Sequence, residues 1–125
     1  MNRESNGIVL EVEKHQFHTP EENEINIIIQ NTSNQEFTYG TYFKIKQNID
    51  SIWYEFPFKN GVGFNDIGLT LKPYESKKES YSLDLFEEAL SLGKYRVLIS
   101  FIDSSKPYSE ENKITLAVPF ELTKK

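Results

Sequence analysis

Two histidines, His15 and His18, supply the only imidazole groups of the chain, within the motif His-Gln-Phe-His. Imidazole nitrogens bind zinc and copper and also act as general bases. Side chains three residues apart on a strand point to opposite faces, so these two can chelate one metal only where the chain turns. Glu21 or Glu22 would then add an oxygen ligand. His15 and His18 are therefore candidate metal ligands, and the alternative is two surface histidines in a loop.

Other catalytic patterns are missing from the sequence. The chain has no cysteine, which excludes thiol nucleophiles, thiolate zinc sites and disulfides. No Gly-x-Ser-x-Gly motif occurs, and a serine nucleophile would have only the two histidines as a base. The segment Gly61-Val-Gly63 lacks the third glycine and the following helix of a phosphate-binding loop. These observations predict a protein that is not an enzyme and carries no cofactor.

Acidic loops leave calcium as an open question. Calcium takes oxygen ligands, and carboxylates from two loops can meet at one end of a fold. The sequence has no Asp-x-Asp-x-Asp-Gly loop, so a calcium site of that type is not expected. The acidic residues that two such loops would contribute are Glu21, Glu22, Glu24, Asp103, Glu110 and Glu111.

Aromatic side chains are concentrated in one stretch of the chain. Residues 37–64 hold nine of the seventeen aromatic residues. Neighbouring strand residues point to opposite faces, so Trp53 and Tyr54 cannot both enter one core. Exposed rings favour the binding of a partner protein or stacking on a sugar. We therefore expect a binding surface here, and the alternative is a cluster buried beneath the 57–66 loop. The candidate residues of this surface are Tyr42, Trp53, Tyr54, Phe56, Phe58 and Phe64.

Alternation of apolar and polar residues predicts the elements that would position these groups. Such alternation over short runs is typical of half-buried strands. The segment Asp84-Leu-Phe-Glu87 has the form of a capping box, so a short helix is expected to begin at Asp84 with Glu87 reaching back. Gly93 would end this helix. The expected strands span 7–14, 25–30, 37–47, 52–56, 67–71, 77–83, 94–102 and 113–122.

Regularly spaced short strands favour an all-β, immunoglobulin-like antiparallel sandwich of seven to eight strands. Tyr95 stands after Gly93 at the entrance to a long strand, where a tyrosine hydroxyl can bond back to the backbone as a tyrosine corner. Without a disulfide, packing must join the sheets, with Trp53 or Phe43 as the central core aromatic. We expect a flexible segment over 1–6 and one domain over 7–123.

Length and charge narrow the function further. A chain of 125 residues is typical of one domain. The net charge of −5 argues against nucleic acid or an anionic membrane as the main partner. No apolar run approaches the ~18 residues that a membrane helix requires, so an integral membrane protein is not expected. The first residues have no apolar segment behind them, as a signal peptide would.

Several groups of residues form a distinctive combination: Ile29-Gln-Asn-Thr-Ser33, Phe37-Thr-Tyr-Gly40, Trp53-Tyr-Glu-Phe-Pro57, Phe64, Ile67-Gly-Leu69, Leu71, Pro73, Leu90 and Gly93-Lys-Tyr-Arg-Val97. Together they resemble the bacterial immunoglobulin-like domains of Bacillus-type Firmicutes. The resemblance covers about residues 7–122. It implies a small β-sandwich of exported or lipid-anchored proteins, with no catalytic residues to carry over. The chain departs from that context because it has neither signal nor lipobox cysteine. We therefore expect an exported or cell-surface protein whose signal is absent here, or a cytoplasmic one if Met1 is the native start.

The sequence thus predicts a non-enzymatic interaction or structural module of a bacterial envelope-associated protein. Its partner would be an unidentified protein or cell-envelope component, and the domain would be a monomer or a dimer paired through a strand edge. A protease-inhibitor module would instead present the 57–66 or the 103–112 loop to a protease. A carbohydrate-binding module would need Trp53 and tyrosines exposed in one plane.

Overall fold

The computed structural model describes residues 3–13, 16–18, 24–64, 68–107 and 109–123. Eleven strands and one short 3₁₀ turn make up its regular structure. In chain order they are β1 (Glu4–Ser5), β2 (Ile8–Val12), β3 (Gln16–His18), β4 (Glu24–Asn31), β5 (Phe37–Tyr39), β6 (Lys44–Ile49), β7 (Ile52–Glu55), β8 (Leu69–Leu71), β9 (Ser76–Ser82), β10 (Gly93–Asp103), η1 (Glu110–Asn112) and β11 (Lys113–Thr123).

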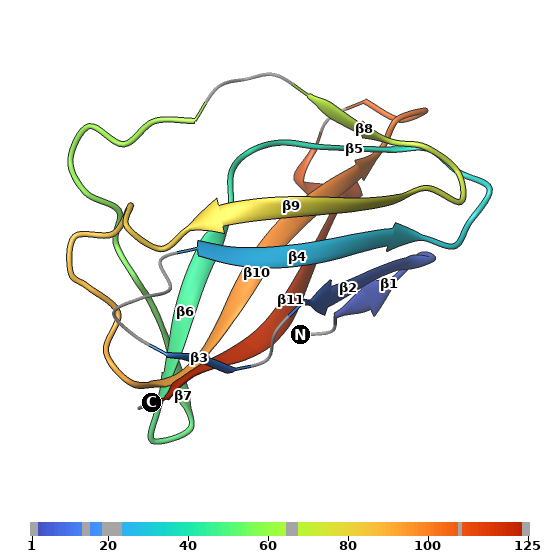
Figure 1. Cartoon of the computed structure of the whole chain (residues 1–125). Coiled ribbons are helices and arrows are strands. Elements are labelled where there is room, and N and C mark those ends of the chain that lie inside the picture. The colour runs from blue at the N-terminus through green and yellow to red at the C-terminus, as the bar shows by residue number, and fades with distance from the viewer. Residues whose placement is uncertain (1–2, 14–15, 19–23, 65–67, 108, 124–125) are drawn as a thin grey trace.

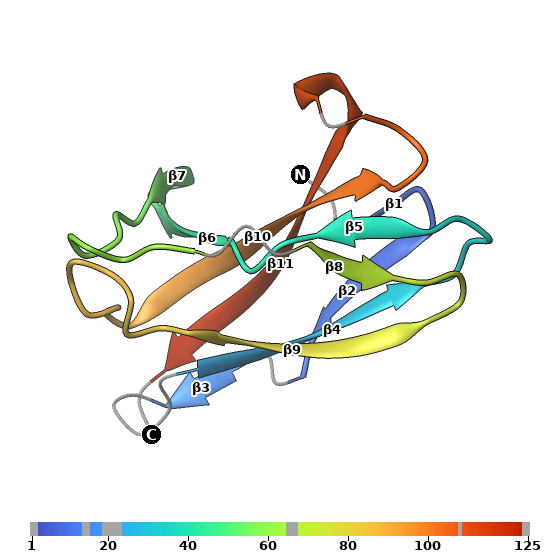
Figure 2. The same ribbon diagram turned by 90° about the horizontal axis from the view of Figure 1, so that it is seen from above.

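The strands form two sheets that pack face to face (Figures 1 and 2). The first sheet has the order β1-β2-β4-β9. The second has the order β3-β11-β10-β5-β8, and β6 pairs with β10 and carries β7 at its outer edge. All pairings are antiparallel except that of β3 with β11. The predicted all-β antiparallel sandwich is therefore confirmed. No helix among the described residues is long and apolar enough to cross a membrane.

The core lies between the sheets and follows from the alternation in the sequence. In β4, Ile25, Ile27 and Ile29 are fully buried, and in β10 the residues Tyr95 and Val97 are buried on the facing sheet. Each buried branched or aromatic side chain of this kind contributes about 1.5–3 kcal/mol of hydrophobic stabilisation. Phe43, one of the two expected core aromatics, is buried in this cluster, whereas Trp53 lies outside it.

The first residues form a hairpin that the sequence analysis missed. Asn6 and Gly7 have φ angles of 54° and 86°, and they join β1 to β2 with Ser5 opposite Ile8. Asn-Gly is the preferred pair for a two-residue hairpin turn with positive φ at both positions. Glu4 and Ser5, which belong to the segment expected over 1–6, therefore lie in a strand.

The N-terminal part of the chain then changes sheets. After β2 in the first sheet, β3 joins the second sheet and runs parallel to the end of β11, with Phe17 opposite Leu122. The polar stretch after residue 14 was expected to be a break without strand structure. It contains β3, so that expectation was wrong at Gln16–His18.

The expected strand over 37–47 is interrupted. Tyr39 pairs with Phe101 and Lys44 pairs with Leu98, so four residues of this strand oppose two residues of β10. Such an insertion bulges the chain outward. Because the number of extra residues is even, Phe43 and Ile45 still point into the core as Phe37 and Tyr39 do. The apolar alternation in the sequence therefore continues through residues 40–43, although the strand is interrupted there.

The helix expected from Asp84 is absent. Residues 83–92 form turns and extended chain, and Phe86 bridges to Phe58. The Glu87 amide donates to the Pro57 carbonyl at 2.9 Å, and the Lys59 amide donates to the Leu85 carbonyl at 2.9 Å. The Phe86 ring is buried and stacks on Phe58 with centroids 4.8 Å apart. Tertiary packing of Phe86 thus overrides the local capping pattern.

The predicted tyrosine corner is present. The Tyr95 hydroxyl donates to the Ser91 carbonyl at 2.6 Å. Gly93 has a φ of 150°, and a Cβ at this position would lie 3.2 Å from the Gln47 amide nitrogen. Gly93 therefore allows the corner to lie close against β6.

Candidate functional site

The six aromatic residues expected to form one binding surface lie in three different places. Phe56, Phe58 and Phe64 pack against the core beneath the 57–64 segment. Phe58 lies edge-on to Phe43 with ring centroids 5.9 Å apart, and Phe56 lies edge-on to Tyr95 at 5.8 Å. For these three rings the alternative of a loop-covered cluster is the correct one, and they are not a free binding face.

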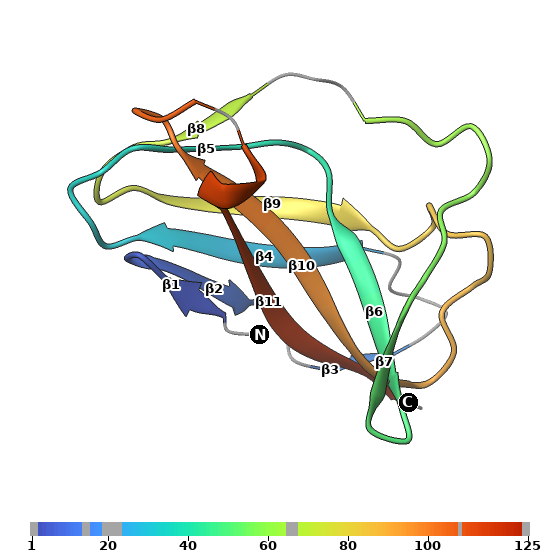
Figure 3. The same cartoon turned by 180° about the vertical axis from the view of Figure 1, so that it is seen from behind.

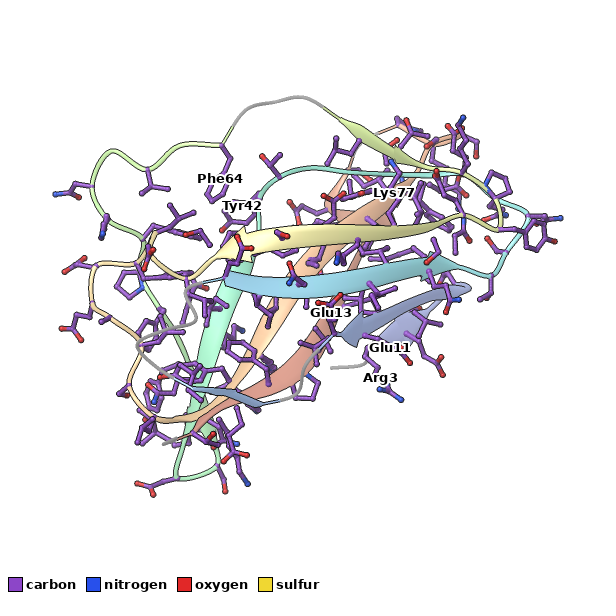
Figure 4. The ribbon with its side chains drawn as sticks, in the orientation of Figure 1. Arg3, Glu11, Glu13, Tyr42, Phe64 and Lys77 are labelled. Carbon is purple, nitrogen blue, oxygen red and sulfur yellow. The ribbon has the colours of Figure 1, made fainter. Side chains whose placement is uncertain are left out.

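Tyr42 closes this cluster from the outside. It comes from the interruption between β5 and β6, and its ring is 5.2 Å from that of Phe64 in an edge-on contact. Figure 4 shows the two side chains together at the side of the sandwich, beside β9. Tyr42 is half exposed, whereas Phe64 is shielded. Tyr42 therefore covers apolar surface of the domain itself.

The β6–β7 hairpin carries the other two residues, Trp53 and Tyr54. Asp50 and Ser51 turn the chain with φ angles of 52° and 68°, and Ile49 faces Ile52 across the turn. The hairpin stands at the edge of the second sheet and is directed away from the first sheet (Figure 2). Its two faces are therefore free of the opposite sheet over most of their length.

One face of the hairpin is apolar and exposed. Ile49, Ile52 and Tyr54 follow the core-facing phase of β6 but lie beyond the core, and they are 46%, 55% and 49% exposed. Leu92 is also exposed, at 50%, in the loop whose Ser91 side chain contacts Gln47 of β6. We call Ile49, Ile52 and Tyr54 the apolar patch.

The opposite face of the hairpin continues the outward face of the second sheet, which Figure 3 turns toward the reader. Trp53 lies on it, and the Arg96 guanidinium from β10 stacks on the Trp53 ring at 4.2 Å from the centroid. A cation in this position over an indole is stabilised by about 0.5–2 kcal/mol. Trp53 and Tyr54 thus point to opposite faces and cannot form the single aromatic plane that a sugar-binding platform needs.

The other candidate residues lie apart from the hairpin. His15 is outside the described residues, and of His18 only the backbone of β3 is described. Among the described residues no three histidine or acidic side chains gather closely enough to hold a metal. Asp103 accepts hydrogen bonds from the hydroxyl and amide of Ser105, which lower the pKa of its carboxyl. Of the other calcium candidates, Glu21 and Glu22 lie outside the described residues, Glu24 begins β4, and Glu110 and Glu111 lie in η1.

The loop that a protease inhibitor would present is held against the domain. The Val62 amide donates to the Lys59 carbonyl at 3.2 Å, and Gly61 supplies the positive φ of this turn. Pro57 and Lys59 hydrogen-bond to the 85–87 segment. Gly61-Val-Gly63 is therefore a turn, as the sequence analysis favoured over a phosphate-binding loop.

Sequence reasoning missed Arg96, Ile49 and Ile52. In the sequence, each of these residues looks like an ordinary core residue or an ordinary solvent-facing residue of a strand or turn. Arg96 alternates with core residues of β10, and Ile49 and Ile52 flank a turn. The signal that would have found them is the pairing register, because it sets Arg96 beside β6 and leaves the hairpin tip beyond the core.

Comparison with known proteins gives a family and a fold. The family model described as a bacterial Ig-like domain matches residues 4–121. The X-ray structure of the Northeast Structural Genomics Consortium target SoR45 is 16% identical, covers 95% of this chain and 88% of that chain, and has a TM-score of 0.57. The ASH/PapD-like domain 7 of human CEP192 is 14% identical to this chain and has a TM-score of 0.44. The match covers 92% of this chain and 84% of that chain. No curated protein matches.

Proposed function

Because the chain belongs to the bacterial Ig-like domain family, we propose that it is a non-enzymatic module that binds a partner protein through the β6–β7 hairpin. Immunoglobulin-like sandwiches present binding residues on strands and loops of a rigid scaffold. The hairpin is joined to that scaffold by the pairing of β6 with β10 and is otherwise open. It can therefore meet a partner without any change in the core.

The apolar patch is the observation that carries this proposal. Six large apolar side chains are exposed among the described residues: Tyr42, Ile49, Ile52, Tyr54, Tyr74 and Leu92. Three of the six belong to the patch, and Tyr42 covers the domain's own aromatic cluster. Single exposed apolar residues are ordinary, but a contiguous group marks an interaction surface.

The chemistry of the patch suits a protein surface. Tyrosine is enriched at the centre of protein interfaces, where its ring is buried and its hydroxyl remains bonded. Ile52 and Tyr54 are also one residue apart from Trp53 and Glu55 along β7, so a partner that wraps the hairpin can contact both faces. Envelope association, which the family resemblance implies, belongs to the same proposal and is tested by immunoblotting of cell fractions.

Photo-crosslinking in the source cells tests the proposal. A photoreactive phenylalanine analogue at Tyr54 should give a discrete adduct with one protein, and Ile52→Asp in the same chain should abolish it. The control places the analogue at Lys78, which is exposed on the first sheet beside Glu13 and should give no such adduct. Adducts of equal yield from both positions, or none from position 54 in folded protein, would contradict the role of the hairpin.

A further inference from the structure

The outward face of the second sheet beside the hairpin is basic in an acidic protein. Four basic side chains, Lys44, Lys46, Lys94 and Arg96, share it with two acidic ones, Glu55 and Glu121. This face therefore has a net charge of +2, whereas the whole chain has −5, so the remainder carries −7. The overall composition does not predict that basic side chains gather on this face.

Strand register brings two of these cations directly together. Lys46 of β6 is the ladder partner of Arg96 of β10 on one side and of Glu55 of β7 on the other, and Glu55 forms its ion pair with Lys44. Like charges in directly opposite positions on one face destabilise a sheet, because their Cβ atoms lie only about 5 Å apart. Lys44 forms an ion pair with Glu55 at 3.5 Å, but no ion pair among the described residues involves Lys46, Lys94 or Arg96.

Arg96 lies over an aromatic ring and has no side-chain hydrogen bond to any residue that the structure describes. Its guanidinium carbon is 4.2 Å from the centroid of the Trp53 ring, and its Nε is buried and makes no hydrogen bond. The contact with Trp53 restricts the guanidinium and does not use its hydrogen-bond donors. Arginine is the side chain best suited to bind a carboxylate through two parallel hydrogen bonds, and a fixed guanidinium loses less entropy in doing so.

On the β11 side, the ladder neighbours of Arg96 are apolar. Pro119 of β11 is its partner on the other side, and Leu98 and Ala117 are paired across the next row. Leu98 and Ala117 are buried although they point away from the core. A ligand on this face thus contacts the basic side chains and Pro119, and not the two buried ones.

We propose that the outward face of β6 and β10 binds a carboxylate-rich polypeptide segment, with a ligand carboxylate between Lys46 and Arg96. This inference rests on the proposed function and specifies its partner as acidic at the contact. The ligand neutralises the unpaired cations and relieves their repulsion. Charge complementarity favours a short acidic segment over a long polyanion, because the charge of −7 on the remainder repels the ends of a nucleic acid.

Trp53 makes the test direct, since it is the only tryptophan of the chain and it contacts Arg96. A capped hexaglutamate peptide is titrated into the protein while Trp53 fluorescence is followed. We expect a saturable change at low ionic strength that weakens as salt is added. Arg96→Gln and Lys46→Gln should each weaken binding about tenfold, as expected for loss of one charge-assisted contact.

Lys78→Gln is the matched control. It also removes one lysine charge, but from the first sheet, where Lys78 pairs with Glu13 at 3.0 Å (Figure 4 labels Glu13). Lys46→Gln removes one of two facing like charges at the surface and should not lower the melting temperature, so lost binding there does not reflect unfolding. Equal loss in Lys78→Gln, no saturable signal, or equally tight binding of a hexanucleotide would each overturn the proposal.

The two proposals fail in distinguishable ways. If crosslinking from position 54 yields one partner but hexaglutamate does not bind, the hairpin function stands and the acidic specificity is wrong. If hexaglutamate binds at Trp53 and crosslinking yields no partner, the basic face is a carboxylate site and the hairpin function is wrong.

Discussion

The hydroxyl of Tyr95 donates to the backbone carbonyl of Ser91, so the start of β10 is tied to the loop that precedes it. Ser91 in turn lies 3.5 Å from the Gln47 side chain of β6. The tyrosine corner thus joins the loop before β10 to β6, which is one strand of the β6–β7 hairpin.

Replacing Tyr95 by phenylalanine removes this hydrogen bond and leaves the ring in place. We expect the free energy of unfolding to fall by about 1–2 kcal/mol, because the Ser91 carbonyl loses a buried donor. Urea denaturation followed by circular dichroism measures the change. Tyr54→Phe, which removes an exposed hydroxyl, should have no effect on stability, and an equal loss in both variants would contradict the role of the corner.

Asn31 is the only buried polar residue among those described, and it joins two turns. Its amide nitrogen donates to the carbonyls of Gln35 and Lys72 at 2.7 and 3.0 Å, and its side-chain oxygen accepts from Ser33. Asn31→Ala leaves several of these groups unpaired, so we expect a loss of about 2–4 kcal/mol in urea denaturation. Asn34→Ala, an exposed change in the same turn, is the control, and equal stability of the two variants would refute this account.

Ser51 has a φ of 68° at the tip of the hairpin, a conformation that glycine adopts without strain. Ser51→Gly should therefore stabilise the domain by up to about 1 kcal/mol. Thermal unfolding measures this gain as a higher melting temperature. Ser76→Gly, in strand β9, should lower the melting temperature, and a decrease for Ser51→Gly would show that the turn is not strained.

Stability should decrease in alkaline solution. Burial raises the pKa of Tyr39 above its ordinary value of 10, and a hydrogen bond to the Glu79 carboxylate raises it further. Burial and the charge of Glu79 also raise the pKa of Tyr81. The unfolded chain releases these protons first, so each tyrosine lowers the unfolding free energy above pH 10 by up to about 1.4 kcal/mol per pH unit.

Urea denaturation between pH 8 and pH 11.5 tests this linkage. Below pH 10 the tyrosines are protonated in both the folded and the unfolded chain, so the free energy of unfolding does not depend on pH through Tyr39 or Tyr81. Tyr39→Phe should flatten the decline above pH 10, whereas Tyr42→Phe, at a half-exposed position, should leave it unchanged. An equally steep decline in Tyr39→Phe would show that this hydroxyl does not govern the alkaline behaviour.

Much of the fold could be predicted because burial imposes a period of two on each strand. Ile25, Ile27 and Ile29 are an example, and the strand they predict is present. The interruption at 40–43 escaped detection because two extra residues preserve that period. The Asn6-Gly7 hairpin was predictable from its turn residues alone and was overlooked.

The site was less predictable, because it depends on contacts between distant strands. The aromatic content of 37–64 is real, but only the structure shows that Phe58 covers the core and that Trp53 faces outward. Lys46 lies opposite Arg96 because of the pairing register of β6 and β10. Local sequence does not specify this register when both faces of a strand carry polar and apolar residues. The false helix at Asp84 reflects the same limit, since Phe86 is drawn to Phe58.

The parallel pairing of β3 with β11 determines how the domain bears a mechanical load. Tension that pulls the two ends of the chain apart draws β3 toward its beginning and β11 toward its end. Because the strands are parallel, these directions are opposite, and the ladder from Gln16 to His18 is loaded in shear. Its hydrogen bonds must then break together and not one after another. An Ig-like module with this arrangement resists extension along the chain more than it resists peeling of the β1–β2 hairpin.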